Sequence, residues 1–183
     1  MRGRLWKKVS VNFQHELEQR FPQFVFDDKD GQYWIWRWKI AFNLHFFVAL
    51  QGFDRRDQFT LEVAWAEGNE MPYLGPAQPH QSEGCVRLGR LFATGPEAPL
   101  WDLAPEKTAA DEAHRESLLG DEIVPYPEDP PVELLLPRIG PLVHDAIEKL
   151  EQYGMPLFRR VAEAHGVKWP DTPRTGGHLK GEP

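Results

Sequence analysis

Hydrophobic and polar residues alternate through most of residues 32–66. The apolar positions fall two residues apart in three runs, a spacing typical of strands that bury one face. Short polar segments separate the runs, so the pattern predicts an antiparallel meander of three strands. The face expected to form a core carries Trp34, Trp36, Trp38, Leu44, Phe46, Val48, Leu50, Phe59, Leu61, Val63 and Trp65.

A helical pattern precedes this meander. Its apolar residues, three and four positions apart, are Trp6, Val9, Phe13 and Leu17. This spacing predicts an amphipathic helix over roughly residues 4–20, and Pro22 ends it because the residue before a proline is pushed out of the helical conformation. A short strand at residues 23–26 should follow, and then a charged turn over residues 27–31, in which Gly31 is free to adopt a positive φ.

The region after the meander is mostly loop. Residues 67–84 hold several glycines and prolines and have no periodicity. Residues 86–92 fit either a fifth short strand or an extended arm, and residues 96–103 are irregular. An exposed helix is expected over residues 107–119, ended by Gly120. The irregular piece has three expected anchors in the core, namely Leu100, Trp101 and Leu103.

The strongest helical pattern lies nearer the C-terminus. A cluster of four prolines precedes it and argues against regular structure there. We expect a helix over residues 139–153, with Pro141 in its first turn and Gly154 as its C-terminal cap. Pro156 should then open a second, shorter helix that Gly166 ends.

Together these elements predict an α+β fold. The expected architecture is an antiparallel β-meander of four to five strands, with an N-terminal helix and a C-terminal helical pair packed on one face. A chain of 183 residues suits a single domain with its own core. We expect that domain over residues 1–169 and a flexible tail over residues 170–183, because the tail lacks apolar anchors.

The charge balance narrows the kind of partner. The chain has a formal charge of −7, which argues against a nucleic-acid ligand and suits a basic protein partner. Its single cysteine, Cys85, cannot form an internal disulfide. We find no secretory signal and no apolar run of roughly 18 residues, as a membrane span requires. A cytoplasmic protein that does not enter a membrane is therefore expected.

No motif for catalysis or cofactor binding occurs. The patterns HExxH, CxxC, GxGxxG, GxxxxGK[ST] and GxSxG are all absent. The aspartates before Gly31 do not fit the spacing of a calcium loop. Cys85 lies in no known nucleophile signature. We therefore expect no catalytic residues, no metal and no cofactor.

The second face of the meander mixes aromatic and charged side chains. Aromatic residues and arginine are typical of the energetically important positions in protein interfaces. The residues proposed to bind a partner here are Tyr33, Arg37, His45, Phe47 and Glu62, with Ile35, Thr60 and Ala64 beside them. The alternative is that the loops of residues 67–104 fold over this face and bury it.

Short motifs along the chain resemble a family of uncharacterised bacterial domains of similar length. They are FTLEVAW at residues 59–65, VRLGRL at residues 86–91, LWDL at residues 100–103 and YGMPLF at residues 153–158. The resemblance covers roughly residues 9–160. Similar proteins are often encoded beside polymorphic toxins, where they look like immunity proteins. The resemblance therefore implies an immunity function, and it identifies no catalytic residues in this chain.

Three functional hypotheses follow from the sequence. The first is a bacterial protein-binding protein, namely an immunity protein. It would neutralise a cognate toxin by occluding the toxin's active site, and the toxin domain it binds would be basic. The second is a small-ligand-binding protein or enzyme with a pocket between the sheet and loops 67–104, formed by Arg37, His45, Glu62 and Cys85. The third is a structural dimer joined through the second sheet face. The oligomeric state does not follow from the sequence.

Overall fold

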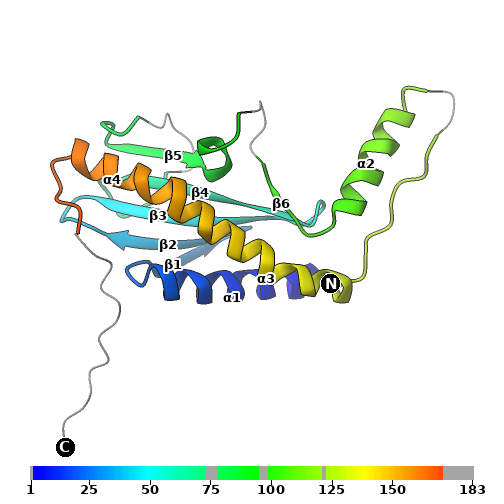
Figure 1. Ribbon diagram of the computed structural model, residues 1–183, viewed down its shortest axis with the longest axis horizontal. Coiled ribbons are helices and arrows are strands. Elements are labelled where there is room, and N and C mark those ends of the chain that lie inside the picture. Colours follow the sequence, from blue (N-terminus) through cyan, green and yellow to red (C-terminus); the bar gives the residue numbers. More distant parts are fainter. Residues whose placement is uncertain (1, 73–77, 95–98, 121–122, 171–183) are drawn as a thin grey trace, which may run out of the picture.

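The computed structural model describes residues 2–72, 78–94, 99–120 and 123–170. It has an α+β architecture in which an antiparallel sheet lies against a layer of helices (Figure 1). The helices are α1 (Arg2–Arg20), α2 (Pro105–Ser117), α3 (Val132–Lys149) and α4 (Met155–Ala164), with a 3₁₀ turn η1 (Leu88–Leu91) and a π-helical turn η2 (Leu150–Gly154). The strands are β1 (Val25–Asp30), β2 (Tyr33–Lys39), β3 (His45–Phe53), β4 (Gln58–Ala66), β5 (Glu83–Arg87) and β6 (Trp101–Asp102).

The sheet confirms the predicted meander and its alternation. The strands follow the order β1-β2-β3-β4-β5, all antiparallel, and β6 pairs with the start of β4. Trp36 lies opposite Val48, which lies opposite Val63, so side chains of the same predicted face line up across three strands. The register therefore places the two faces as the period-two pattern requires.

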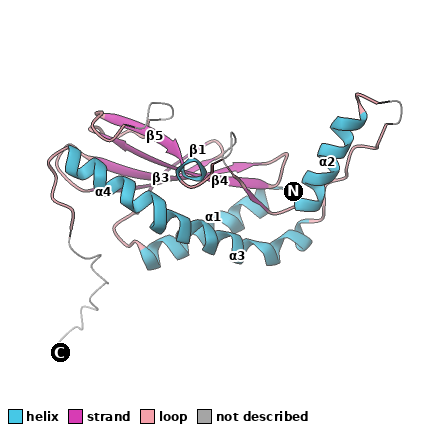
Figure 2. Cartoon of the chain, turned by 45° about the horizontal axis from the view of Figure 1, so that its top comes forward, coloured by secondary structure: helices cyan, strands magenta, loops and turns pink. Residues whose placement is uncertain are grey.

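Helices α1, α3 and α4 cover one face of the sheet (Figure 2). Phe158 of α4 stacks on Phe46 of β3 with ring centroids 4.6 Å apart. Phe13 of α1 packs against Trp36 of β2 at 4.9 Å. These contacts form the main core, because α1 and the C-terminal helices supply apolar stripes that the sheet needs to bury.

The first strand differs from its prediction. The charged residues 27–30, expected to form a turn, continue β1 as far as Asp30. Every residue of β1 is exposed, since this is the edge of the sheet. Charged side chains are common on such an edge, where they discourage pairing with another chain. The turn itself falls at Gly31, whose φ of 56° is positive as predicted.

The C-terminal helices also differ in their boundaries. Helix α3 begins at Val132, so Pro141 lies inside the helix and not in its first turn. Gly154 is not a cap, because its backbone is helical and the chain passes through η2 directly into α4. A Cβ atom at Gly154 would lie 2.6 Å from Leu150 Cδ1 and 3.3 Å from Val63 Cγ1. The glycine therefore permits close approach of this helix to β4.

Two other expectations about the loops hold. Trp101 and Leu103 are buried anchors as predicted, whereas Leu100 is only half-buried, and Gly166 ends α4 with a φ of 67°. A fifth strand is present, but its bounds differ from the prediction: β5 overlaps the expected segment 86–92 only at residues 86 and 87, and residues 88–91 form the 3₁₀ turn η1. The predicted tail falls outside the described residues from position 171 onward.

Candidate functional site

The second face of the sheet is largely buried. Of the five residues predicted there, Phe47 is 0% exposed, His45 4% and Glu62 8%. Tyr33 and Arg37 are half-buried. Phe47 lies opposite Arg37 on one side and Ala64 on the other, so the strands do bring several of these side chains together. Their burial limits what a partner could touch without moving the loops.

A loop segment supplies the cover. Met71 is buried in a small cluster on this face with Ile35, Phe47, Ala49, Ala64 and Ala66. Arg37 fixes the same segment by donating a hydrogen bond to the Asn69 carbonyl at 3.3 Å, and it pairs with Asp27 at 2.8 Å. The alternative in which a loop covers the face therefore holds at its centre. A depression of about 450 Å³ remains beside Arg37 and His45.

A titratable pair occupies the other end of this face. The thiol of Cys85 donates to Glu62 Oε2 at 3.7 Å, and Arg87 lies 4.0 Å from the other carboxylate oxygen. Burial, and then the negative charge of Glu62, raises the pKa of Cys85 to about 12. Because the thiolate is the nucleophilic form, this environment keeps Cys85 unreactive near neutral pH. The geometry gives the second hypothesis no activated nucleophile here.

Two further titratable groups on this face, His45 and Tyr33, have pKa values shifted in favour of their neutral forms. Burial lowers the pKa of His45, and the charges of Arg37 and Lys39 lower it further. Burial raises the pKa of Tyr33, with Glu62 adding to the effect. Desolvation disfavours the charged form in each case. These pKa shifts are typical of polar groups that protein covers, so the second face of the sheet offers little surface to a partner.

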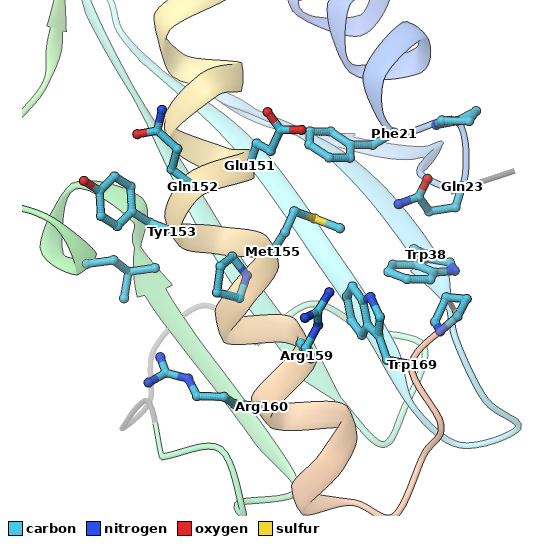
Figure 3. A pocket seen from close by; sticks show the side chains of 14 residues that line it. Phe21, Gln23, Trp38, Glu151, Gln152, Tyr153, Met155, Arg159, Arg160 and Trp169 are labelled. Atoms are coloured by element: carbon cyan, nitrogen blue, oxygen red, sulfur yellow. The ribbon is translucent and has the colours of Figure 1, made fainter. Parts of the chain in front are cut away.

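The first such surface is a groove of about 1080 Å³ on the outer side of α4. In Figure 3, Trp38 and Trp169 lie on one side of the helix, and Tyr153 and Arg160 lie on the other. We call this feature the groove; its lining is Phe21, Pro22, Gln23, Trp38, Leu91, Glu151, Gln152, Tyr153, Met155, Pro156, Arg159, Arg160, Trp169 and Pro170. It combines aromatic, aliphatic and arginine side chains, the residue types that dominate binding energy in interfaces.

The charge of the groove is positive. Its one carboxylate, Glu151, is bound by Arg20 of α1. Arg159 lies over the ring of Trp169, with its guanidinium carbon 5.7 Å from the ring centroid. Neither Arg159 nor Arg160 has a carboxylate partner among the residues that the structure describes. The groove is therefore suited to an apolar group with a nearby negative charge.

The second surface is a projecting hairpin formed by residues 105–120 and 123–131, which we call the arm. It consists of α2 and the extended segment that returns to α3, and it extends away from the sheet and the other helices (Figure 1). Of the 13 residues of α2, only Lys107 is buried. At its far end, Leu119 is 94% exposed, Ile123 68% and Tyr126 61%. Exposed apolar residues gathered in one place mark an interaction surface more often than scattered ones do.

The returning segment is attached to α2. His114 Nδ1 donates to the carbonyl oxygen of Val124 at 2.6 Å, and the ring of His114 meets Tyr126 edge-to-face at 5.4 Å. Val124 in turn donates its backbone N–H to Ser117 Oγ at 2.9 Å. These contacts join the two sides of the arm, so that it projects as one unit.

The base of the arm is held by ionic contacts. Lys107 donates to the Arg55 carbonyl at 2.7 Å and to Asp129 at 2.6 Å, and lies 3.4 Å from Asp57. Because Lys107 and Asp129 belong to opposite ends of the arm, their contact closes the hairpin. Arg2 of α1 pairs with Asp57 at 2.8 Å on the same carboxylate oxygen. Burial would lower the pKa of Lys107, but its carboxylate partners outweigh burial and raise it.

A further clamp lies on the outside of the base. Arg138 of α3 makes two parallel hydrogen bonds to the Glu106 carboxylate, at 2.7 and 2.8 Å, and one to the Leu103 carbonyl at 3.0 Å. The hydrogen bonds from Arg138 lower the pKa of Glu106 to about 2. Two-point contacts of this kind fix direction as well as distance. The arm is therefore oriented by the body of the domain.

Comparisons with known proteins give no family for this chain. No protein-family model, no curated protein and no solved structure matches it. The described residues contain no group of three or more His, Cys, Asp or Glu side chains placed to hold a metal ion. No helix in the described ranges is long and apolar enough to cross a membrane.

Sequence reasoning missed both surfaces. The arm had a signal that was available, since residues 105–131 hold eight acidic and two basic residues, a formal charge of −6 out of −7 for the chain. Counting charge by segment would have marked it. The groove had no such signal. Its residues come from positions as distant as Phe21, Trp38 and Trp169, which only the fold brings together.

Proposed function

We propose that this chain is a protein-binding protein that engages its partner through the arm. The observation that supports the proposal is a hairpin with almost all of the chain's net charge and an exposed apolar end. A solvent-exposed Leu119 contributes nothing to the stability of the domain, whereas it would contribute to binding once a partner removes it from water. The partner is a basic protein with an apolar cleft.

The shape and charge of the arm suit occlusion of a cleft. Both of its ends are fixed by Lys107, Asp129 and Arg138, so little conformational freedom would be lost at its base on binding. Its acidic side chains would attract a positively charged cleft and speed association. Glu112 and Glu116 are without an ion-pair partner among the described residues and are available for this role.

The finer form of the proposal is an immunity function. In it, the partner is a toxin whose basic active site is occupied by the arm, and the block is steric. The resemblance of the sequence motifs to immunity-like bacterial domains is its support, together with the acidic, apolar chemistry of the arm. In this form the arm takes the role first assigned to Tyr33, Arg37, His45, Phe47 and Glu62, because the structure buries three of those five.

The test uses the protein encoded by the neighbouring gene. Purified chain and toxin domain are mixed, and both complex formation and toxin activity are measured. The parent chain should bind and protect, and the affinity should fall as salt is raised. Leu119→Ser should weaken binding by roughly tenfold or more, whereas Phe42→Ser, at an apolar residue 93% exposed elsewhere, should have no effect.

A charge test separates the arm from the rest of the surface. The double variant Glu112→Lys and Glu116→Lys should slow association with the basic partner, with the largest effect at low salt. The variants should unfold at the parent's temperature, because these side chains are on the solvent side of α2. The proposed function is wrong if the arm variants bind the partner as well as the parent chain does, or if the parent chain forms no complex with the partner.

A further inference from the structure

The groove and the arm have complementary chemistry. The groove presents two arginines without carboxylate partners among the described residues: Arg159 lies over the ring of Trp169, and Arg160 lies on the other side of α4 (Figure 3). The arm presents exposed leucine, isoleucine and tyrosine side chains within a strongly acidic segment. The two surfaces therefore match: the apolar side chains of the arm can pack on the apolar surface of the groove, and the carboxylates of the arm can pair with the guanidinium groups of the groove.

The two surfaces cannot meet within one molecule. The groove lies along α4 and the arm contains α2, and these helices are at opposite ends of the domain in both views (Figures 1 and 2). The base of the arm is fixed by Lys107 and Arg138, so the arm cannot swing back over its own sheet without breaking those contacts. The partner of the groove must be outside the molecule.

We infer that the arm of one copy docks in the groove of a second copy. Each copy has one arm and one groove, so a reciprocal exchange about a two-fold axis satisfies both surfaces on both copies and closes the assembly. In this contact the apolar end of the arm, including Leu119 and Tyr126, packs against Trp38 and Trp169. The arm's carboxylates then lie near Arg159 and Arg160.

This self-association would regulate the proposed function. An arm that is docked in a second copy is not free to enter a partner's cleft, so the dimer is a stored form and the partner must compete with it. The regulatory part rests on the proposed function of the arm. The docking itself requires no outside partner, so the two proposals can fail separately.

The experiment measures mass in solution across the micromolar range by sedimentation velocity, with the full chain. The parent should be a concentration-dependent dimer that weakens as salt rises. An arm variant, Leu118→Ser with Leu119→Ser, and a groove variant, Arg159→Glu with Arg160→Glu, should each weaken the dimer by roughly tenfold or more. The controls are Phe42→Ser and Arg4→Glu, at residues that are 93% and 74% exposed and belong neither to the arm nor to the lining of the groove.

Mixing the two variants gives the decisive result. The arm variant retains an intact groove and the groove variant retains an intact arm, so together they should form a heterodimer with one arm–groove contact. A variant that merely misfolds would not be rescued in this way. The groove variant alone should still bind the toxin partner, which separates this inference from the proposed function.

Three outcomes would overturn the inference. One is a parent chain that is monomeric at every concentration, which would leave the groove to a different protein. Another is a dimer that neither variant weakens, which would place the interface elsewhere. The last is a pair of variants that stay monomeric when mixed although each is folded by circular dichroism.

Discussion

The cation at the base of the arm gives the sharpest test of how this fold is held together. Lys107→Met removes the ammonium group and keeps an unbranched side chain of similar length. In the parent, the side chain of Lys107 is 5% exposed and that of Asp57 is 0% exposed. The substitution leaves the Arg55 carbonyl without this donor and leaves Arg2 as the cation nearest Asp57.

The expected cost follows from these contacts. Removing one partner of a buried ion pair costs about 3–5 kcal/mol in general. The cost should fall at the lower end here, about 3 kcal/mol, because Arg2 still lies 2.8 Å from the Asp57 carboxylate. With a urea m value of about 2 kcal/mol/M, the unfolding midpoint should fall by about 1.5 M.

The assay is equilibrium unfolding in urea, followed by tryptophan fluorescence. Arg115→Met is the matched control, because it also removes a cation from α2 but at a side chain 60% exposed, and it should cost at most about 0.5 kcal/mol. Adding Asp57→Asn to Lys107→Met should recover part of the loss, since it removes the uncompensated carboxylate. Asparagine tolerates the positive φ of 53° at this position.

Two results would refute this reasoning. If Lys107→Met cost no more than Arg115→Met, the burial of the pair would have no energetic consequence. If Asp57→Asn and Lys107→Met were additive in the double variant, the two side chains would not interact.

Three further predictions concern packing and pH. Gly84→Ala should destabilise the fold by about 2–3 kcal/mol, because its Cβ atom would lie 2.3 Å from Cζ2 of the buried Trp65. Glu62→Gln should raise the melting temperature at pH 7 but not at pH 4. Burial raises the pKa of Glu62, so the folded state favours the protonated form and loses stability as pH rises through that pKa. Glu106 has a pKa lowered to about 2 by Arg138, so its contribution is present above its ordinary carboxyl range and is lost as pH falls towards 2. The α2 resonances in NMR spectra should therefore shift over that interval, more than those of α1.

Each of these predictions has a control and an outcome that contradicts it. Gly68→Ala, at a glycine with open space around it, should leave the unfolding midpoint unchanged, and equal effects at Gly68 and Gly84 would contradict the packing argument. For Glu62→Gln, a gain in melting temperature that was the same at both pH values would show that charge is not the cause. For Glu106, the acid-induced shifts should move up to the ordinary carboxyl range in an Arg138→Met variant, and shifts that stayed near pH 2 there would point to a different titrating group.

The alternation of residues was enough to predict the centre of the fold. Strands β2, β3 and β4 have apolar side chains at every second position, and a slip of one residue would place that entire set on the wrong face. The sequence therefore determined the meander and the face that each side chain takes, and the pairing of Trp36 with Val48 agrees with these faces. Helix α1 was equally clear, because a 3.6-residue period and a following proline define its length.

Helix boundaries and β1 were less well determined, because local signals there compete with tertiary packing. The charged segment 27–30 has turn-like composition, but the neighbouring β2 offers hydrogen bonds that draw it into the sheet. Glycine is typical of C-terminal helix caps, yet Gly154 lies within the helix and lets it approach Val63 closely. Neither outcome follows from the local sequence.

The candidate surfaces divide in the same way. The acidity of the arm and the presence of Leu118 and Leu119 in it follow from the sequence alone, because charge and composition are properties of one continuous segment. Only the tertiary structure decided that this segment projects, that Met71 helps to bury the second face of the sheet, and that Trp38 and Trp169 share one groove. The physical reason is that burial and proximity depend on contacts between segments far apart in the chain, whereas charge and periodicity are local.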